Sequence, residues 1–227
     1  HLLSRRQRQM CIRDRSIAFM AVATSSMAQS LNKMNWLNEP QQWEIKDGKT
    51  LVMDVPAKTD FWRISHYGFT VDDGPFYYAT YGGEFEAKVK ITGNYVTTFD
   101  QMGLMLRIDH ENWIKAGVEY VDGKQDVSAV VTHRTSDWSV VQLPDAPRSI
   151  WIKAVRRLDA VEIFFSRDDK EYIMMRTCWL QDNCPVMVGL MGACPDGKGF
   201  TATFEEFKVT PLADQRRLEW AKRQMDK

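Results

Sequence analysis

Several patterns that would identify a class of chemistry are missing from this chain of 227 residues. Its four cysteines form no Cys-x-x-Cys pair, which argues against a zinc ribbon or a thioredoxin-like redox site. The patterns Gly-x-Ser-x-Gly, Gly-x-Gly-x-x-Gly and Gly-x-x-x-x-Gly-Lys-Ser/Thr do not occur, so serine-hydrolase and nucleotide-binding loops have no support. The histidines show neither a His-x-His nor a His-Glu-x-x-His spacing. We therefore predict no cofactor and no metal site.

An excess of charge of one sign is also lacking. Lys and Arg number 30 and so do Asp and Glu, which gives a net charge of zero. Without a basic footprint we predict no nucleic-acid partner. The apolar stretch at residues 17–23 is far too short to span a membrane. Hydrophobic residues make up 44% of the chain, and the length suits one all-β domain, which can reach about 200–250 residues.

Residues 1–30 differ in composition from the rest of the chain. The first fifteen are basic and resemble translated sequencing-adapter read-through; a genuine basic segment or a basic arm for an anionic partner is the alternative. Residues 16–28 are apolar and small, and Ser26-Met27-Ala28 has the shape of a signal-peptidase site. We expect residues 1–30 to be an adapter-derived segment plus a truncated signal peptide. A secreted or periplasmic location follows, with a cytoplasmic one as the alternative.

Apolar and polar residues alternate with a period of two over most of the chain after Trp43, which is typical of β-strands. The clearest case is Phe85 to Ile91, where every second residue is charged. Further strands are predicted at residues 51–55, 101–109, 113–120, 125–133, 138–142, 150–157, 161–166, 171–177, 186–193 and 202–209. Turns rich in Asp, Gly and Pro separate them. Many short strands at this spacing predict a sandwich or jelly roll. The tail has helical propensity.

The stretch from Phe99 to Val121 predicts a hairpin with one apolar and one polar face, because side chains alternate across a strand. Aromatic planes can stack on sugar rings, and planar polar groups can fix hydroxyls in set directions. A solvated sheet face with a cross-strand pair between Arg107 and Glu119 is the alternative interpretation. The candidate ligand-binding residues on and beside the polar face are Trp62, Arg63, Gln101, Arg107, Trp113, Lys115, Glu119 and Trp138.

Five motifs occur in an order that resembles a known family. They are Asp60–Arg63, Phe99–Arg107, Glu111–Glu119, Ser136–Ser139 and Gly197–Phe200. Together they are similar to the concanavalin A-like family of domains of unknown function that carries the label "regulation of enolase". The resemblance implies an all-β, concanavalin A-like jelly roll of two sheets and no settled activity. We predict this domain at residues 34–211 and a short C-terminal helix at residues 212–227.

A glycoside hydrolase needs two facing carboxylates, about 5–5.5 Å or about 6.5–9.5 Å apart according to mechanism. The chain lacks the Glu-x-Asp-x-Glu run with which retaining glucanases of this shape carry both on one strand. The remaining catalytic candidates are Glu119, as acid or base, with Asp109 or Asp100 as its partner.

The leading prediction is a non-catalytic, lectin-like module that binds a glycan or a small saccharide. A glycoside hydrolase or lyase is one alternative. A protein-interaction module that regulates a metabolic enzyme, as the family label suggests, is another. Cys178 and Cys184 flank a short turn and could form a disulfide in an exported protein; buried free thiols are the other interpretation. The sequence leaves the oligomeric state open.

Overall fold

A computed structural model describes residues 31–226 of the chain. The expectations for residues 1–30, an adapter-derived segment and a signal peptide, lie outside the described residues. A short 3-10 helix, Leu31–Lys33, precedes the first strand. Within the described range the protein is an all-β fold with one α-helix near the end, as predicted.

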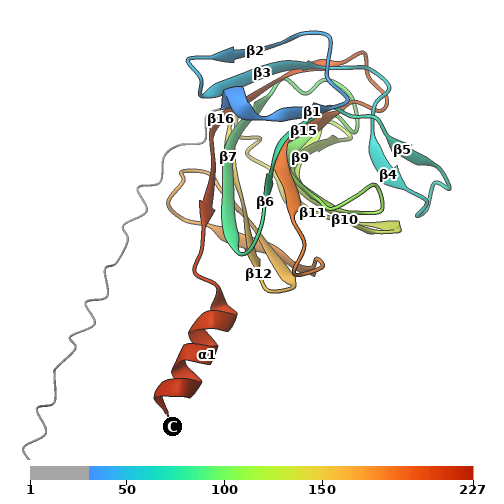
Figure 1. Ribbon diagram of the computed structural model, residues 1–227. Helices are drawn as coiled ribbons and strands as arrows, with labels where there is room; N and C mark the ends of the chain where they lie inside the picture. The colour runs from blue at the N-terminus through green and yellow to red at the C-terminus, as the bar shows by residue number, and fades with distance from the viewer. Residues whose placement is uncertain (1–30, 227) are drawn as a thin grey trace, which may run out of the picture.

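Two antiparallel seven-stranded sheets form the body of the described chain (Figure 1). In spatial order the first sheet contains β1 (Asn35–Leu37), β6 (Phe76–Tyr81), β15 (Val186–Ala193), β8 (Gln101–Arg107), β9 (Asn112–Val121), β10 (Lys124–His133) and β11 (Thr135–Leu143). The second contains β14 (Ile173–Trp179), β13 (Ala160–Ser166), β12 (Ile150–Arg157), β7 (Phe85–Gly93), β16 (Phe200–Pro211), β3 (Thr50–Val55) and β2 (Trp43–Lys46). Strands distant in sequence are neighbours, with β15 between β6 and β8. This order confirms the predicted two-sheet jelly roll.

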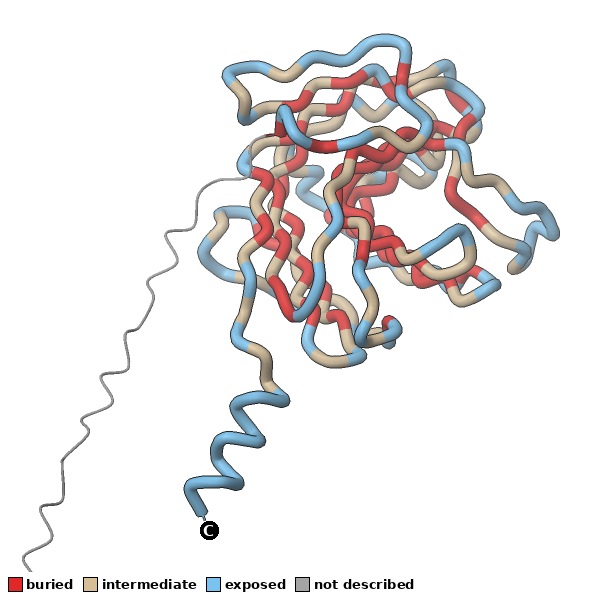
Figure 2. Tube along the Cα trace, viewed as in Figure 1, coloured by how far each residue is buried: buried red, intermediate tan, exposed pale blue. Residues whose placement is uncertain are grey.

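The main core lies between the two sheets and is built from the apolar face of each alternating strand. On β7, Phe85, Ala87, Val89 and Ile91 are at most 1% exposed, whereas the charged residues between them face outward. Figure 2 shows the buried residues concentrated along the strands in the middle of the molecule. Burial of this apolar area is the dominant stabilising term of the fold. The period-two prediction therefore holds for the sheet interior.

A separate two-stranded arm crosses the outer face of the first sheet. It comprises residues 60–73, with β4 (Phe61–Arg63) paired to β5 (Thr70–Asp72). Phe61 and Trp62 join a second buried cluster with Met105, Trp113 and other residues of the first sheet. Strand β8 is consequently buried along its whole length. We expected the polar face of the hairpin at Phe99 to Val121 to be open to solvent. That expectation is wrong along much of β8 and β9, because the arm covers them.

The C-terminal helix α1 (Gln215–Met225) follows β16 and projects from one end of the sandwich (Figures 1 and 2). Asp214 caps it, since its carboxylate accepts a hydrogen bond from the Arg216 backbone N–H at 2.9 Å. The Arg216 guanidinium also contacts Asp182 and Asn183 of the β14–β15 loop. No residue of the helix is buried. The predicted short helix is present and touches the sandwich at its first turn.

Candidate functional site

Strands β8 and β9 form the floor of a pocket on the outer face of the first sheet. Lys115, Gly117 and Glu119 of β9 point to the same side, because side chains alternate along a strand. Gln101 of β8 is the ladder partner of Glu119, and Gly103 is the partner of Gly117. A Cβ on Gly117 would lie only 1.9 Å from a backbone carbonyl oxygen of β8. The middle of the floor therefore carries no side chain, and Lys115 and Glu119 border a hollow.

Aromatic rings of the arm form the wall of this pocket. The rings of Trp62 and Tyr67 meet edge to face with centroids 5.6 Å apart, and Tyr67 stacks on Phe69 at the same centroid distance. The Trp62 Nε1–H donates to the Ser65 carbonyl at 2.8 Å, which fixes the indole. Tyr67 is 49% exposed and Phe69 44%. A cluster of aromatic side chains exposed to solvent typically marks a binding site.

The tip of the arm is held in a backbone conformation that is rare for its residues. Ile64 has a φ of 67° and His66 a φ of 62°. A left-handed conformation is a genuine outlier for a β-branched residue such as isoleucine. A hydrogen bond of 2.7 Å from the Gly68 N–H to the Ile64 carbonyl closes the tip. Such strain costs about 1–3 kcal/mol per residue and clusters at ligand clamps and active sites.

Lys115 is a buried cation whose hydrogen bonds join the arm to the floor. Its side chain is 6% exposed. The ammonium donates to the Phe61 carbonyl at 2.7 Å and to Gln101 Oε1 at 2.5 Å. It lies 3.6 Å from Asp60 Oδ1. Since an ammonium has three N–H donors, these three protein groups satisfy it.

Glu119 is a buried carboxylate at the base of the pocket, only 6% exposed. Ser128 Oγ donates to Glu119 Oε2 at 2.7 Å, and Trp138 Nε1 donates in turn to Ser128 Oγ at 3.0 Å. Burial raises the pKa of Glu119 above its usual value, and the Asp60 carboxylate acts in the same direction. The Lys115 ammonium and the Ser128 hydroxyl offset part of this rise. The carboxylate is therefore incompletely compensated by the protein alone.

The arm and the floor together enclose a pocket of about 260 Å³. Five of the eight predicted ligand-binding residues line it. They are Trp62, Gln101, Lys115, Glu119 and Trp138. The structure thus brings these five residues together around one pocket, and their role in binding stays a prediction.

The other three predicted residues lie outside the pocket and hold the arm against the sheet. Arg107 makes a bidentate pair with Asp72 of β5, at 2.5 and 2.6 Å. Arg63 Nη2 pairs with Glu111 at 2.7 Å, which ties β4 to the β8–β9 turn. Trp113 is 1% exposed beneath the arm. In this structure these side chains position the arm instead of facing the pocket.

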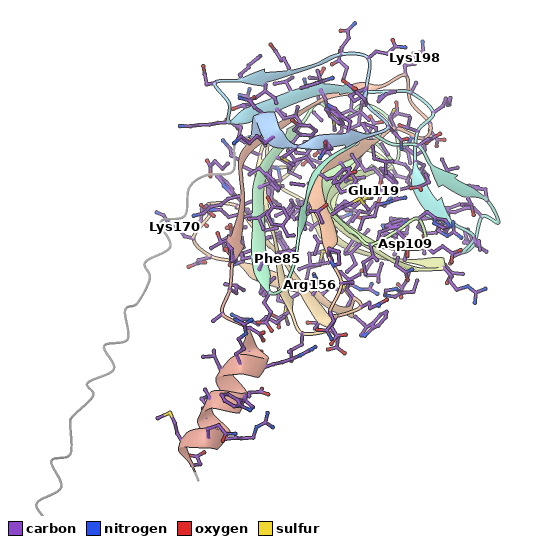
Figure 3. The ribbon with its side chains drawn as sticks, viewed as in Figure 1. Phe85, Asp109, Glu119, Arg156, Lys170 and Lys198 are labelled. Atoms are coloured by element: carbon purple, nitrogen blue, oxygen red, sulfur yellow. The ribbon has the colours of Figure 1, made fainter. Side chains whose placement is uncertain are left out.

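The expected carboxylate partners of Glu119 are elsewhere. Asp100 is fully buried, and its Oδ2 accepts two backbone N–H groups of the preceding turn at 2.8 Å. Asp109 Oδ1 accepts the Asn112 N–H at 2.8 Å in the β8–β9 turn. Although burial raises the pKa of Asp109, these turn hydrogen bonds hold it below its usual value. The strand register separates Asp109 from Glu119, both labelled in Figure 3: Asp109 contacts Asn112, the first residue of β9, whereas Glu119 lies near the other end of that strand. The predicted acid–base pair of Glu119 with Asp100 or Asp109 is therefore not assembled. The alternative cross-strand pair between Arg107 and Glu119 is not formed either, because Arg107 pairs with Asp72.

Six residues of the pocket wall were missed by the sequence reasoning. They are Asp60, Tyr67, Phe69, Phe99, Pro195 and Asp196. Two of the family-like motifs do contain Asp60 and Phe99, so a signal was present for these positions. Tyr67 and Phe69 come from a short segment without a strand pattern, and nothing in its composition places it over β8 and β9.

Residues 31–226 contain no group of three or more His, Cys, Asp or Glu side chains arranged to hold a metal ion. In the same range no helix is both long and apolar enough to cross a membrane. What the pocket offers to a ligand is a set of carboxylates, one ammonium and several aromatic rings.

Cys178 and Cys184 are free thiols, and so is Cys194. The Cys178 thiol contacts the Val161 carbonyl at 3.5 Å within its own sheet, and burial raises its pKa to about 11. The Cys184 thiol contacts the Gln181 carbonyl at 3.3 Å in the following loop. The disulfide considered for Cys178 and Cys184 is therefore not formed, and the free-thiol interpretation holds for this pair.

The fold and the site define a two-sheet jelly-roll domain with a small pocket on the outer face of one sheet. The chain belongs to the family described as "Protein of unknown function (DUF1349)", whose model matches residues 36–212. This match confirms the family resemblance inferred from the motifs.

Known relatives agree with this membership. "Regulation of enolase protein 1" from Saccharomyces cerevisiae is 35% identical over 180 residues, which are 79% of this chain and 90% of that protein. The crystal structure of a functionally unknown protein from Saccharomyces cerevisiae has a TM-score of 0.77 at 34% identity, and the match covers 82% of this chain and 100% of the other. The carbohydrate-binding module CBM66 from Bacillus subtilis has a TM-score of 0.51 at 14% identity, covering 79% and 98% of the two chains. At that identity the likeness shows the fold alone.

The relatives correct one prediction. We expected a secreted or periplasmic protein, on the basis of residues 16–28. The relative that covers most of the chain is a yeast protein named for the regulation of enolase, and a yeast structure aligns over 82% of the chain. This relationship contradicts the expected export. The segment that suggested it lies outside the described residues.

Proposed function

We propose that this chain is a non-catalytic carbohydrate-binding module whose site is the pocket between the arm and the floor. The observation that carries the proposal is the meeting of exposed aromatic rings with buried polar groups. Tyr67, Phe69 and Trp138 present ring surface at the mouth, and Glu119 and Gln101 lie at the base. Ring faces suit the C–H faces of a sugar, and the polar groups at the base suit its hydroxyls.

The size of the pocket supports a small ligand. Its volume of about 260 Å³ falls just below the range of about 300–1,000 Å³ for drug-sized ligands. One sugar ring, or the end of a glycan chain, is the ligand of matching size. The likeness in fold to a carbohydrate-binding module makes this class of ligand the one to test.

A binding role is favoured over hydrolysis by the state of the second carboxylate at the pocket. Asp60 Oδ1 already accepts the Phe61 N–H at 2.7 Å and lies 3.6 Å from the Lys115 ammonium. A carboxylate engaged in this way holds the arm in place and is poorly available as a nucleophile or a base. Asp60 is therefore poorly suited to be the partner of Glu119 in glycoside hydrolysis.

A glycan array probed with the whole chain tests the proposal. We expect selective binding, and we expect Trp138→Ala to weaken it by about tenfold, because Trp138 lines the pocket and supports Ser128. Trp220→Ala is the matched control, since Trp220 lies exposed on α1 and far from the pocket in sequence. Absence of binding by the folded chain, or equal loss in both variants, would contradict the proposal.

A second candidate, a protein-interaction module, is favoured by the name of the yeast relative. Leu218 and Trp220 of α1 would offer exposed apolar contacts. Titration of the chain into purified enolase by calorimetry tests this candidate. A specific complex that is lost in Trp220→Ala and kept in Trp138→Ala would support it over the carbohydrate-binding proposal.

A further inference from the structure

The donor groups on the pocket's nitrogen-bearing side chains are already engaged inside the protein. The Lys115 ammonium is satisfied by two carbonyl oxygens and the nearby Asp60 carboxylate. The Gln101 amide donates to the Phe99 carbonyl at 3.2 Å and towards Asp60 at 3.4 Å. The indole N–H groups of Trp62 and Trp138 donate to Ser65 and Ser128. A ligand therefore meets few free nitrogen donors.

The carboxylate oxygens of the pocket, by contrast, can accept further hydrogen bonds. An ionised carboxylate has about four lone-pair positions. Glu119 accepts from Ser128 through Oε2, which leaves Oε1 available to a ligand. Asp196 is an exposed residue at the mouth of the same pocket. The ligand that completes this site is one that brings hydrogen-bond donors.

The charges of the lining point in the same direction. Three carboxylates, of Asp60, Glu119 and Asp196, share the pocket with the single ammonium of Lys115. The two arginines nearby, Arg63 and Arg107, are paired with carboxylates away from the pocket. Glu119 is buried and accepts a side-chain hydrogen bond from Ser128, and this burial raises the pKa of its carboxyl. An anionic sugar would be repelled here, and a cationic one would supply the missing charge.

Aromatic faces add a second attraction for a cation. The rings of Trp62, Tyr67, Phe69 and Trp138 line the wall beside Glu119. The negative face of an aromatic ring attracts an ammonium group within about 6 Å of its centroid. Rings and carboxylates around one small pocket are the arrangement with which proteins recognise organic cations.

Resting on the proposed carbohydrate-binding function, we infer that the sugar this pocket prefers carries a protonated amine. The pocket would take a hexosamine ring, with its ammonium group on Glu119 and its apolar face against the aromatic wall. Neutral sugars of the same shape lack the charge that Glu119 and the rings attract. N-acetylated and acidic sugars lack it as well.

Sugars that differ at one position test the inference. Glucosamine and glucose differ at C2, where one has an ammonium and the other a hydroxyl; galactosamine and galactose form a second pair. N-acetylglucosamine keeps the nitrogen and removes its charge. Calorimetry with the whole chain at about pH 6.5 should show an amine at least about tenfold tighter than its neutral partner in one pair or both, as a charge-assisted contact provides.

Glu119→Gln removes the charge and keeps the shape of the side chain. In this variant we expect the ratio of amine affinity to neutral-sugar affinity to fall below about threefold. Glu162→Gln is the matched control, because Glu162 faces outward on β13 of the other sheet. The control should keep the full preference.

The outcomes separate the inference from the function on which it rests. Equal or tighter binding of neutral, acetylated or acidic sugars would overturn the inference and leave the carbohydrate-binding proposal standing. Binding of n-propylammonium as tight as that of glucosamine would show recognition of charge alone and would also overturn it. If no sugar and no array glycan binds the folded chain, the proposed function fails and the inference fails with it.

Discussion

Replacing Lys115 with methionine tests whether one buried cation joins the arm to the floor. The lysine ammonium is 2.7 Å from the Phe61 carbonyl, 2.5 Å from Gln101 Oε1 and 3.6 Å from Asp60. Methionine preserves most of the volume but leaves two acceptors without a donor and one carboxylate without its cation. Each orphaned acceptor costs about 1–3 kcal/mol, and a broken buried ion pair costs about 3–5 kcal/mol in all. We therefore expect the free energy of unfolding to fall by about 3–5 kcal/mol.

Urea unfolding followed by tryptophan fluorescence measures this loss. With an m-value of about 2.5 kcal/mol/M, the midpoint should fall by about 1.2–2 M at unchanged m. Lys124→Met is the control, because Lys124 is exposed at the first position of β10, and it should change stability by no more than about 0.5 kcal/mol. A loss below about 1 kcal/mol for Lys115→Met would refute the reasoning, because the arm would then not depend on the buried cation.

Three further predictions follow from the same structure. Burial raises the pKa of Glu119, so the folded state binds the carboxyl proton more tightly than the unfolded state does. The stability that this proton contributes is fully present below the unfolded-state pKa and is lost as pH rises through the folded-state pKa. The Tm of Glu119→Gln relative to the natural chain should therefore be higher at about pH 8 than at about pH 4, and the opposite trend would contradict the assignment. Gly117→Ala should destabilise the protein by about 3 kcal/mol or more, since the added Cβ would lie 1.9 Å from a backbone atom. Gly82→Ala is the control, because a Cβ there meets nothing within 4 Å and should be nearly neutral. Equal urea midpoints for the two variants would show that β8 and β9 can separate. In a Cys11→Ser background a thiol reagent at about pH 8 should modify Cys184 before Cys178, whose pKa is raised to about 11, and equal rates would contradict the raised pKa of Cys178.

Local alternation explains why the sheets could be predicted. Every second residue of β7 faces the core, so the strand can be predicted from a window of nine residues. The same rule placed Lys115 and Glu119 on one face of β9, where they do border the pocket. A pattern of this kind reports which side a residue faces, and it says nothing about what covers that side.

The arm shows the limit of that reasoning. Strands β4 and β5 have three residues each, too few for a periodic signal. Their place over the first sheet is fixed by contacts between distant residues, such as Arg107 with Asp72, 35 positions apart. Because sequence alone did not reveal this cover, Trp113 was expected at a sugar-binding surface and is instead buried beneath the arm.

The family could be predicted because five short motifs kept their order, whereas the location could not. The yeast relatives contradict the export that we inferred from a segment of small apolar residues. A short apolar run that ends in a site such as Ser26-Met27-Ala28 is a weak sign of a signal peptide. In predicting the location, we gave this segment more weight than the family resemblance.

The central claim is that a saccharide binds in the pocket between the arm and the floor. Indole N–H resonances in an NMR titration test it most directly, because the chain has eight tryptophans and only Trp62 and Trp138 line this pocket within the described residues. On addition of glucosamine, the account predicts that these two resonances shift together and saturate. Trp151, Trp179 and Trp220, which are partly or largely exposed elsewhere, should stay in place. Shifts confined to these other tryptophans, or no shift at any of them with glucosamine and the array glycans, would contradict the account.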